Sequence, residues 1–300
     1  MEYDGAGTLQ KEDTIMRFAS QGSVTVDPMT PRDLDLAIEW AAREGWNPGL
    51  DDAACFYPAD PEGFLIAYAG KTPVGTISAV RYGEDFGFIG LFLVTPDRRG
   101  RQVGLVLADK AFRHLSGRCI GLDGVEQKVR NYTTQGFKLA WRNVRYKGTA
   151  APQDTRDAHV VSVTPELLPE IEEYDRLCFP APRSSFLAAW TSAPHATTLA
   201  WRDDALRGYG TIRQCREGYK IGPLFADTPD IAWELYHALG ASIPAGEAVF
   251  LDVPEPHAVA TALAKEHAMT PVFATARMYN QDPPTIDLNR VFGVTTFELG

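Results

Sequence analysis

LVTPDRRGRQVGLVLADKAF, residues 93–112, joins an apolar run to a segment with helical apolar spacing through a short basic loop. Gly100 and Gly104 carry no side chains, so their backbone N–H groups can approach a ligand closely. The loop opens the predicted helix 105–115, and a helix N-terminus carries partial positive charge and free N–H donors. Three arginines add full positive charge: Arg98, Arg99 and Arg101. The stretch therefore favours a phosphate or pyrophosphate; a glycine-bearing surface turn with solvated arginines is the alternative.

The loop differs from other common phosphate-binding motifs. The sequence contains no GxxxxGK(S/T), which excludes a P-loop. It contains no GxGxxG either, so a dinucleotide-binding fold is disfavoured.

Strands and helices alternate around the loop. Thr30, Pro31 and Asp33 predict a capped helix start, and Gly45 is placed to end that helix. Apolar runs predict strands at 23–29, 64–70, 72–83, 86–94, 119–125 and 138–148. Helices are predicted at 30–45, 105–115 and 126–136.

The second half of the chain echoes the first. IGLFLVTPD at Ile89 resembles IGPLFADTPD at Ile221, and GLDGV around Leu122 resembles FLDVP around Leu251. RNVRYKG, which contains Arg145, resembles ATARMYN, which contains Arg277. Three similarities in the same order, at a near-constant offset, predict a duplicated domain. We therefore expect a flexible tail at 1–22, domains at 23–148 and 159–300, and a linker at 149–158 that is rich in Ala, Gly, Pro, Asp and Thr.

The second copy lacks the basic glycine loop. There TPD runs directly into IAWELYHALG, with Thr228 as the predicted helix cap and Pro229 in the first turn. The loop at 98–104 is therefore not needed to build the fold, which favours a ligand-binding role for it.

Composition narrows the possible functions. The net charge is −10 with a pI near 5.1, which argues against general nucleic-acid binding. The four cysteines form no CxxC pair and the histidines show no ligand spacing, so we expect no metal site. No signal-peptide core and no apolar run of membrane-spanning length is present, so we expect a cytoplasmic protein without membrane contact.

The loop and the segment after it resemble the GCN5-related N-acetyltransferase (GNAT) superfamily. The loop pattern of that family is (Gln/Arg)-x-x-Gly-x-(Gly/Ala), and Arg99, Gly100, Arg101, Gln102, Val103 and Gly104 occupy it, with Gln102 in place of the usual first glycine. Tyr132, Gly136 and Phe137 match the Tyr-x-x-x-Gly-Phe that the family commonly shows. GWNPGLDD, GLDGV, FLAAW, GYGTIR, IGPLFAD and RMY look like a bacterial subgroup with two GNAT-like domains, of which the second lacks the acyl-CoA loop.

The resemblance implies an α/β (α+β) fold with two fused GNAT-type domains, each a mixed, mostly antiparallel sheet flanked by helices. It implies acetyl-CoA as cosubstrate, with its pyrophosphate held by residues 99–104 and Leu105. A backbone N–H near Leu93 or Val94 would polarise the thioester carbonyl, and Tyr132 is placed like the family's general acid. A packing role for Tyr132 is the alternative.

The proton acceptor and the acceptor pocket are less defined. Asp123 is the first candidate base, with Glu84 and Asp85 as alternatives, but Asp252 echoes Asp123 and so favours a structural role for both. Trp46, Asn47 and Asp51 lie in the loop that usually lines the acceptor side in this family. Phe179 or Arg183 of the second domain could close the pocket, and an arginine would suit a carboxylate-bearing acceptor.

These expectations combine into one function and two rivals. The chain is expected to move an acetyl group to a primary amine of a small molecule, as a monomer or homodimer. The alternatives are a protein or peptide N-acetyltransferase and a non-catalytic acyl-CoA sensor.

Overall fold

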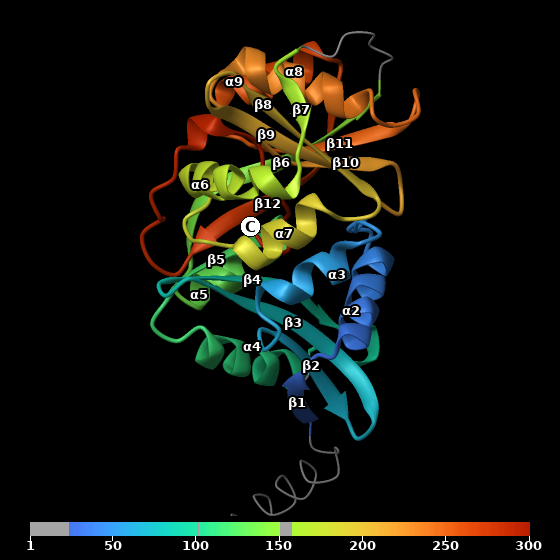
Figure 1. Ribbon diagram of the computed structural model, residues 1–300. Coiled ribbons are helices and arrows are strands. Elements are labelled where there is room, and N and C mark those ends of the chain that lie inside the picture. The colour runs from blue at the N-terminus through green and yellow to red at the C-terminus, as the bar shows by residue number, and fades with distance from the viewer. Residues whose placement is uncertain (1–23, 101, 151–157) are drawn as a thin grey trace, which may run out of the picture.

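The computed structural model describes residues 24–100, 102–150 and 158–300. The predicted tail 1–22, Arg101 and most of the predicted linker lie outside these residues. Figure 1 shows the first half of the chain in blue and green below the second half in yellow and red.

The first half forms the predicted elements. Thr30 and Asp33 build the expected capping box: the Asp33 carboxylate accepts from Thr30 N at 2.9 Å, and Thr30 Oγ1 accepts from Asp33 N at 3.3 Å. The strands are β1 (Val24–Pro28), β2 (Phe64–Ala69), β3 (Thr72–Tyr82), β4 (Phe86–Val94), β5 (Cys119–Val125) and β6 (Lys138–Thr149). The helices are α2 (Pro31–Arg43), α3 (Asp52–Phe56), α4 (Val103–His114) and α5 (Val129–Thr134), with short 3₁₀ turns η1 (Tyr57–Ala59), η2 (Pro96–Arg98) and η3 (Glu126–Lys128).

The second half repeats this order, as the internal repeat predicts. Its strands are β7 (Val160–Ser162), β8 (Ala196–Arg202), β9 (Leu206–Gln214), β10 (Tyr219–Ala226), β11 (Ala248–Pro254) and β12 (Thr270–Tyr279). Its helices are α6 (Leu168–Cys178), α7 (Ser184–Thr191), α8 (Pro229–Gly240) and α9 (Ala258–Glu266). The 3₁₀ turn η4 (Pro165–Leu167) precedes α6, and η5 (Leu288–Arg290) and the short β13 (Val291–Gly293) follow β12.

The two halves exchange their last strands. The sheet order is β1-β2-β3-β4-β5-β12-β6-β11-β10-β9-β8-β7, so β12 lies against β5 and β6 lies against β11. Within this sheet β4–β5 and β10–β11 pair in parallel, and the other pairs named in that order are antiparallel. The two repeats are thus separated near residue 148 in the sequence, but in the structure a single continuous sheet contains strands of both halves.

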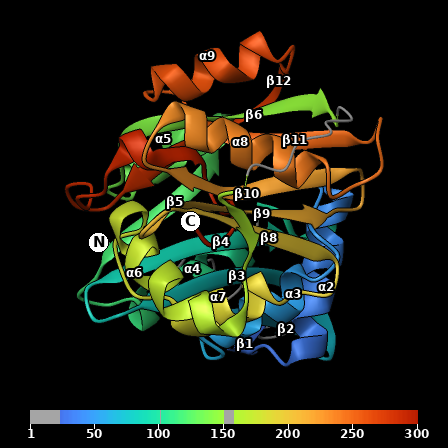
Figure 2. The ribbon, with the colours of Figure 1, turned by 45° about the horizontal axis from the view of Figure 1, so that its top comes forward.

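Helices cover both faces of this sheet (Figure 2). On one face α2 and α3 of the first half meet α7 of the second, and Phe56 stacks on Trp190 with ring centroids 6.0 Å apart. On the other face α4 packs over the first half, with Val103, Leu107 and Ala111 buried. Leu235 and Leu239 of α8 are buried in the second half on that face. The site described next lies where the first half meets the second.

The last residues of the chain run into the interior between the halves. Residues 291–300 are all buried, and the C-terminal end lies in the middle of the molecule in Figure 1. The Tyr82 hydroxyl donates to Leu299 O at 3.1 Å, which ties this tail (residues 294–300) to β3. The tail therefore contributes side chains to the junction of the two halves.

Candidate active site

Strand β4 carries a bulge just before the residues expected to polarise a thioester. Ser78 pairs with Gly90 and Thr76 pairs with Leu93, so β4 holds one extra residue between these pairs. Leu91 takes a φ of +45°, which is uncommon for a residue with a side chain, and Thr76 Oγ1 donates to its carbonyl at 2.9 Å. A bulge re-aims backbone groups that would otherwise pair along the strand.

Strands β4 and β5 separate after their first four pairs. Phe86–Ile89 pair with Cys119–Leu122, and residues 90–94 no longer pair with β5. β5 continues instead along β12, up to the pair Val125–Thr275. The end of β4 thus presents backbone groups toward an opening, where an extended ligand can lie as an additional strand.

The loop before α4 leaves the helix N-terminus open. Gln102 takes the N-cap position but its side chain makes no capping hydrogen bond. Gly100 has a φ of +73°, and a Cβ built on it would meet nothing within 4 Å. A Cβ on Gly104 would lie 3.4 Å from Phe92 Cζ. The first N–H groups of α4 are therefore available to an anion.

The other loop residues differ in exposure. Val103 is buried against the sheet, whereas Leu105 is 71% exposed. Arg99 does not project freely: its Nε donates to Val94 O at 3.0 Å and its Nη2 pairs with Glu44 at the end of α2. Arg99 thus positions the loop relative to β4, which the charge pattern alone did not reveal.

In the second half, the chain's own residues cap the corresponding helix N-terminus and fill the corresponding gap between strands. The Thr228 hydroxyl accepts from Ile231 N at 3.3 Å, so the predicted cap of α8 is confirmed. β10 and β11 also separate after Ile221 and Leu251, but there β13 pairs with β10, and Val294 N donates to Asp252 O at 2.8 Å. Among residues 24–100, 102–150 and 158–300, no strand pairs with the end of β4 on the side facing β5, whereas β13 occupies the corresponding place beside β10.

Tyr132 of α5 packs beside the end of β5. A Cβ on Gly124 would lie 2.5 Å from Tyr132 Cε2, and the tyrosine ring meets Phe137 edge-on at 6.4 Å between centroids. Burial raises the pKa of the Tyr132 phenol. The phenol therefore stays protonated at neutral pH and can donate a proton.

Asp123 lies in an ion pair instead of facing a ligand. Arg277 of β12 grips its carboxylate with Nε 3.0 Å from Oδ1 and Nη2 2.6 Å from Oδ2, and Asn143 Nδ2 donates to Oδ1 at 2.8 Å. Burial raises the pKa of Asp123, and the Arg277 guanidinium opposes that shift. The structure therefore assigns Asp123 to the joining of the exchanged strands, which argues against the proton-accepting role that the sequence suggested. Glu84 and Asp85 lie exposed in the β3–β4 turn.

The predicted acceptor loop docks onto the second half. Asn47 takes a φ of +52° and exchanges two hydrogen bonds of 2.8 Å with the backbone of Glu217. Asp51 accepts from the backbone N and the ring of His195 at 2.8 and 3.0 Å. These two side chains therefore hold the halves together. Trp46 packs partly buried, and its carbonyl accepts hydrogen bonds from two cations described below.

Arg183 is engaged in the interior. Its Nε and Nη2 bind the Asp175 carboxylate at 2.8 and 2.7 Å, and Nη2 also donates to Thr295 Oγ1 at 2.9 Å. Its side chain has no exposed surface. Because its guanidinium is bound to Asp175 and Thr295, the structure argues against the expected pairing of Arg183 with a carboxylate of the acceptor.

The structure brings together three buried charged residues that the sequence analysis did not single out. Arg213 of β9, Lys220 of β10 and Glu298 of the tail are all at most 6% exposed. Lys220 Nζ donates to Trp46 O at 3.3 Å, and Arg213 Nε donates to Asp52 Oδ1 at 3.0 Å. A charge inside an apolar strand such as YKIGPLFA is a sequence signal that could have found Lys220. No comparable local signal marks Glu298.

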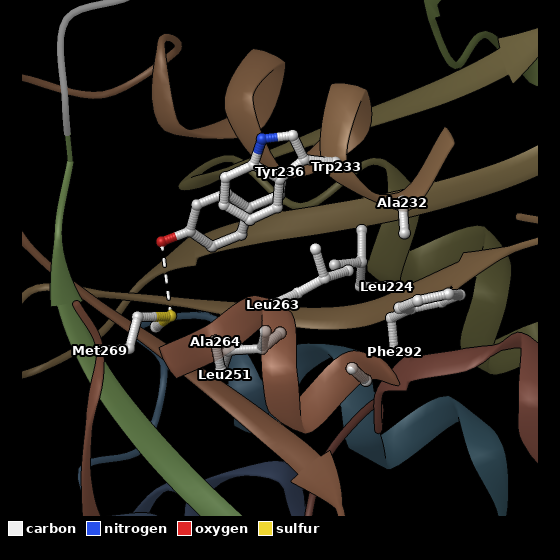
Figure 3. A pocket seen from close by; sticks show the side chains of 10 residues that line it. Leu224, Ala232, Trp233, Tyr236, Leu251, Leu263, Ala264, Met269 and Phe292 are labelled. Carbon is white, nitrogen blue, oxygen red and sulfur yellow. Dashed lines mark hydrogen bonds between the residues drawn. The ribbon is translucent and has the colours of Figure 1, made fainter. Parts of the chain in front are cut away.

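A small cavity in the second half is not a second ligand site. It measures about 10 Å³ and lies between α8, α9 and β10, where Leu224, Trp233, Leu263 and Phe292 are among the residues lining it (Figure 3). That volume is about the space of one water molecule, and the lining is almost wholly apolar. It is a packing defect of the second core.

Two further findings concern only the described residues 24–100, 102–150 and 158–300. No group of three or more His, Cys, Asp or Glu side chains there is arranged to hold a metal ion. No helix in these ranges is both long and apolar enough to cross a lipid bilayer.

Comparison with known proteins places the chain in a superfamily. The acetyltransferase (GNAT) family profile matches residues 34–137, and an acetyltransferase (GNAT) domain profile matches residues 171–293. The chain therefore belongs to the GNAT superfamily of acyltransferases and carries two GNAT domains, as the resemblance in sequence implied.

Its relatives include proteins of the same two-domain length. Holothin acyltransferase of a Pseudoalteromonas species is 29% identical over 97% of this chain and 99% of its own. A crystal structure of a proposed acetyltransferase from Pyrococcus horikoshii superposes with a TM-score of 0.78 at 22% identity, covering 92% of this chain and 96% of the other. A tandem GNAT protein from the clavulanic acid biosynthesis pathway superposes with a TM-score of 0.60 at 14% identity, covering 88% and 100%.

Proposed function

We propose that the protein is an N-acetyltransferase that moves an acetyl group from acetyl-CoA to a primary amine of a small molecule by direct attack. One contrast between the halves carries the proposal. The first half has an uncapped helix and an opening beside β4, whereas the second half caps its helix with Thr228 and fills its opening with β13. A single cofactor site, in the first half, follows.

The residues of the first half fit a bound CoA. The N–H groups at residues 100–105 would hold the pyrophosphate, because a helix N-terminus with free donors favours an anion. Gly100 and the open space around it allow close approach of the backbone. The pantetheine arm would lie beside residues 90–94 of β4, in the place that β13 takes beside β10.

Three groups would serve the chemistry. A backbone N–H at Leu93 or Val94 would donate to the thioester oxygen, on which negative charge develops during attack. Tyr132 would give its proton to the departing thiolate, because its raised pKa keeps the phenol protonated. The amine nitrogen forms the new bond to the carbonyl carbon, the carbon–sulfur bond breaks, and the amine proton leaves to a base or water.

The relative of similar length supports a small-molecule acceptor. It is named for acylating holothin, and it aligns over nearly the whole of both chains. The tail of the second half packs against β4, and the loop at 46–52 of the first half is docked onto the second half, which disfavours a long peptide. A protein acetyltransferase and a non-catalytic acyl-CoA sensor remain the rival functions.

Two measurements test the proposal. Calorimetric titration of the full chain with CoA should give one site, and release of free thiol from acetyl-CoA should depend on an added amine. Binding without thiol release for any member of an amine library would favour the sensor. Thiol release with peptides but with no small amine would favour the protein acetyltransferase. No heat with CoA would refute the cofactor assignment.

A further inference from the structure

A buried polar cluster lies between the two halves, on the face covered by α3 and α7. It contains three cations and three anions, each at most 6% exposed: Arg145, Arg213, Lys220, Asp52, Asp252 and Glu298. Glu298 interacts electrostatically with all three cations. Aromatic rings form part of its wall, with the Arg213 guanidinium 4.5 Å from the Trp190 ring centroid and that of Arg145 4.8 Å from Phe297.

Two ion pairs account for part of this charge. Arg145 binds Asp252 in a bidentate fashion at 2.6 and 2.7 Å. Arg213 binds Asp52 through its Nε alone, at 3.0 Å. These two pairs fix the cluster in place. The remaining cation, Lys220, and the remaining anion, Glu298, form no direct ion pair with each other in the described part of the chain.

Three polar atoms in the cluster have unused capacity. Within the described part of the chain, Arg213 Nη1 and Glu298 Oε2 are buried without a hydrogen-bond partner. Lys220 Nζ has three protons and donates one hydrogen bond, to Trp46 O. Buried charged groups are rarely left unsatisfied in a native protein, so donors and an acceptor held together in this way indicate an occupant.

The cluster adjoins the bulge in β4. The Glu298 backbone packs directly on Gly90, so closely that a Cβ there would collide with the Glu298 carbonyl. Gly90 precedes Leu91, the residue with positive φ in the bulge. The tail therefore places the backbone of Glu298 against the bulge that precedes Leu93 and Val94, where the thioester carbonyl is expected.

Resting on the proposed function, we infer that this cluster binds the acceptor and that the acceptor is a primary amine with a carbonyl oxygen close to its nitrogen. Glu298 Oε2 receives a proton of the amine, while Arg213 Nη1 and Lys220 Nζ donate to the carbonyl oxygen. This division of roles follows from the single acceptor and the two donors that the cluster leaves unused.

The net charge of the cluster favours an acceptor that is itself neutral. The three cations and three anions already cancel, so a group of net charge would be costly to bury there. An α-amino amide, bound as the neutral amine, keeps the balance, whereas an amino acid brings an additional carboxylate. Burial and the nearby Arg145 lower the pKa of Lys220, which further limits its capacity to balance a carboxylate.

The proposed step conserves atoms and charge. The amine nitrogen bonds to the acetyl carbon, the carbon–sulfur bond breaks, and the electron pair of that bond goes to sulfur. Glu298 takes the proton that the nitrogen loses, and the thiolate takes a proton from Tyr132. Water returns both side chains to their starting states.

The test compares matched amines with matched variants. Alaninamide, alanine and sec-butylamine share a branched amine-bearing carbon, but only the first has a neutral carbonyl. The wild-type protein should acetylate alaninamide with the highest kcat/KM. Glu298→Gln should lower kcat for alaninamide by about a hundredfold, as expected for a lost base. Lys220→Met should raise the KM for alaninamide about tenfold and leave that for sec-butylamine unchanged.

Two controls distinguish a failure of this inference from a folding defect of the variants and from a failure of the proposed function. Thr296→Ala removes a tail hydrogen bond to Leu299 N and leaves the carboxylate, so its kinetic constants should match the wild type. All variants should keep the wild-type affinity for CoA. If CoA does not bind, the proposed function itself fails. If CoA binds but alaninamide is not acetylated, or is acetylated no better than sec-butylamine, the inference is wrong. It is also wrong if Glu298→Gln and Lys220→Met both match the wild type, because the cluster then holds only water.

Discussion

Asp123 of β5 and Arg277 of β12 form a buried bidentate ion pair across the exchanged strands, with two N···O distances of 3.0 and 2.6 Å. The residues stand directly opposite each other in the antiparallel register. Arg145 and Asp252 make the same contact between β6 and β11. The pair therefore occurs once at each exchanged strand, and in both cases it joins residues from different halves.

The Asp123–Arg277 pair should be strongly coupled in stability. Asp123→Leu or Arg277→Met alone should lower the free energy of unfolding by about 3–5 kcal/mol, because each leaves one buried charge unpaired. The double variant should lose less than the sum, because no charge remains. Urea denaturation of the four proteins measures this coupling, and additive losses would show that the two charges do not depend on each other.

Gly104→Val should weaken acetyl-CoA binding. A Cβ at this position would already be in van der Waals contact with Phe92 at 3.4 Å, so the two methyl groups of valine would crowd the space between α4 and Phe92 and displace the backbone donors of the loop. We expect the KM for acetyl-CoA to rise about tenfold, the equivalent of one charge-assisted hydrogen bond. Gly240→Ala at the end of α8, where a Cβ meets nothing within 4 Å, is the control. Unchanged kinetics for Gly104→Val would count against the loop as the cofactor site.

Tyr132→Phe should lower kcat and leave the KM for acetyl-CoA unchanged. Loss of a general acid typically reduces the rate by about a hundredfold or more. Because burial raises the pKa of Tyr132, the wild-type kcat should not fall through ionisation of this phenol until the pH exceeds its ordinary value of about 10. A pH profile of kcat from neutral pH to about 9.5 checks this. A kcat for Tyr132→Phe equal to that of the wild type would leave the residue with a packing role.

Asp60 should make stability depend on pH in the acid range. Burial disfavours its ionisation, but hydrogen bonds from His114 and Arg81 outweigh this and hold the pKa of the carboxyl well below its ordinary value. Its contribution is therefore complete above about pH 5 and is lost progressively as the pH falls below that. The difference in unfolding free energy between the wild type and Asp60→Asn should shrink between pH 5 and pH 3. A difference that stays constant over this range would contradict the assignment.

Local patterns predicted the local structure well. The capping box of Thr30 and Asp33, the cap at Thr228 and the strand-to-helix passage at residues 93–112 depend on neighbours within a few positions, and the structure contains all three. The internal similarity of Ile89 with Ile221 and of Arg145 with Arg277 predicted the duplication, because equivalent residues occupy equivalent strands.

Side-chain partners were harder to predict. The family resemblance made Asp123 a candidate base, and Arg183 was a candidate partner for a carboxylate of the acceptor, yet each is paired with another charge in the interior. Their partners Arg277 and Asp175 are ordinary surface residue types, and nothing adjacent in sequence indicates that they are buried. Glu298 likewise packs its backbone against Gly90 of β4 only because the tail turns back into the protein.

The amino-acid sequence by itself determined the elements, their order, the duplication and the open loop before α4, because propensity, capping and apolar periodicity act over a few residues. The tertiary structure alone decided the exchange of β6 and β12, the filling of the second opening by β13, and the meeting of Arg213, Lys220 and Glu298. A strand's alternating pattern records which face is buried but not which strand lies beside it. That choice comes from packing and ion pairing between residues more than a hundred positions apart, which no local pattern contains.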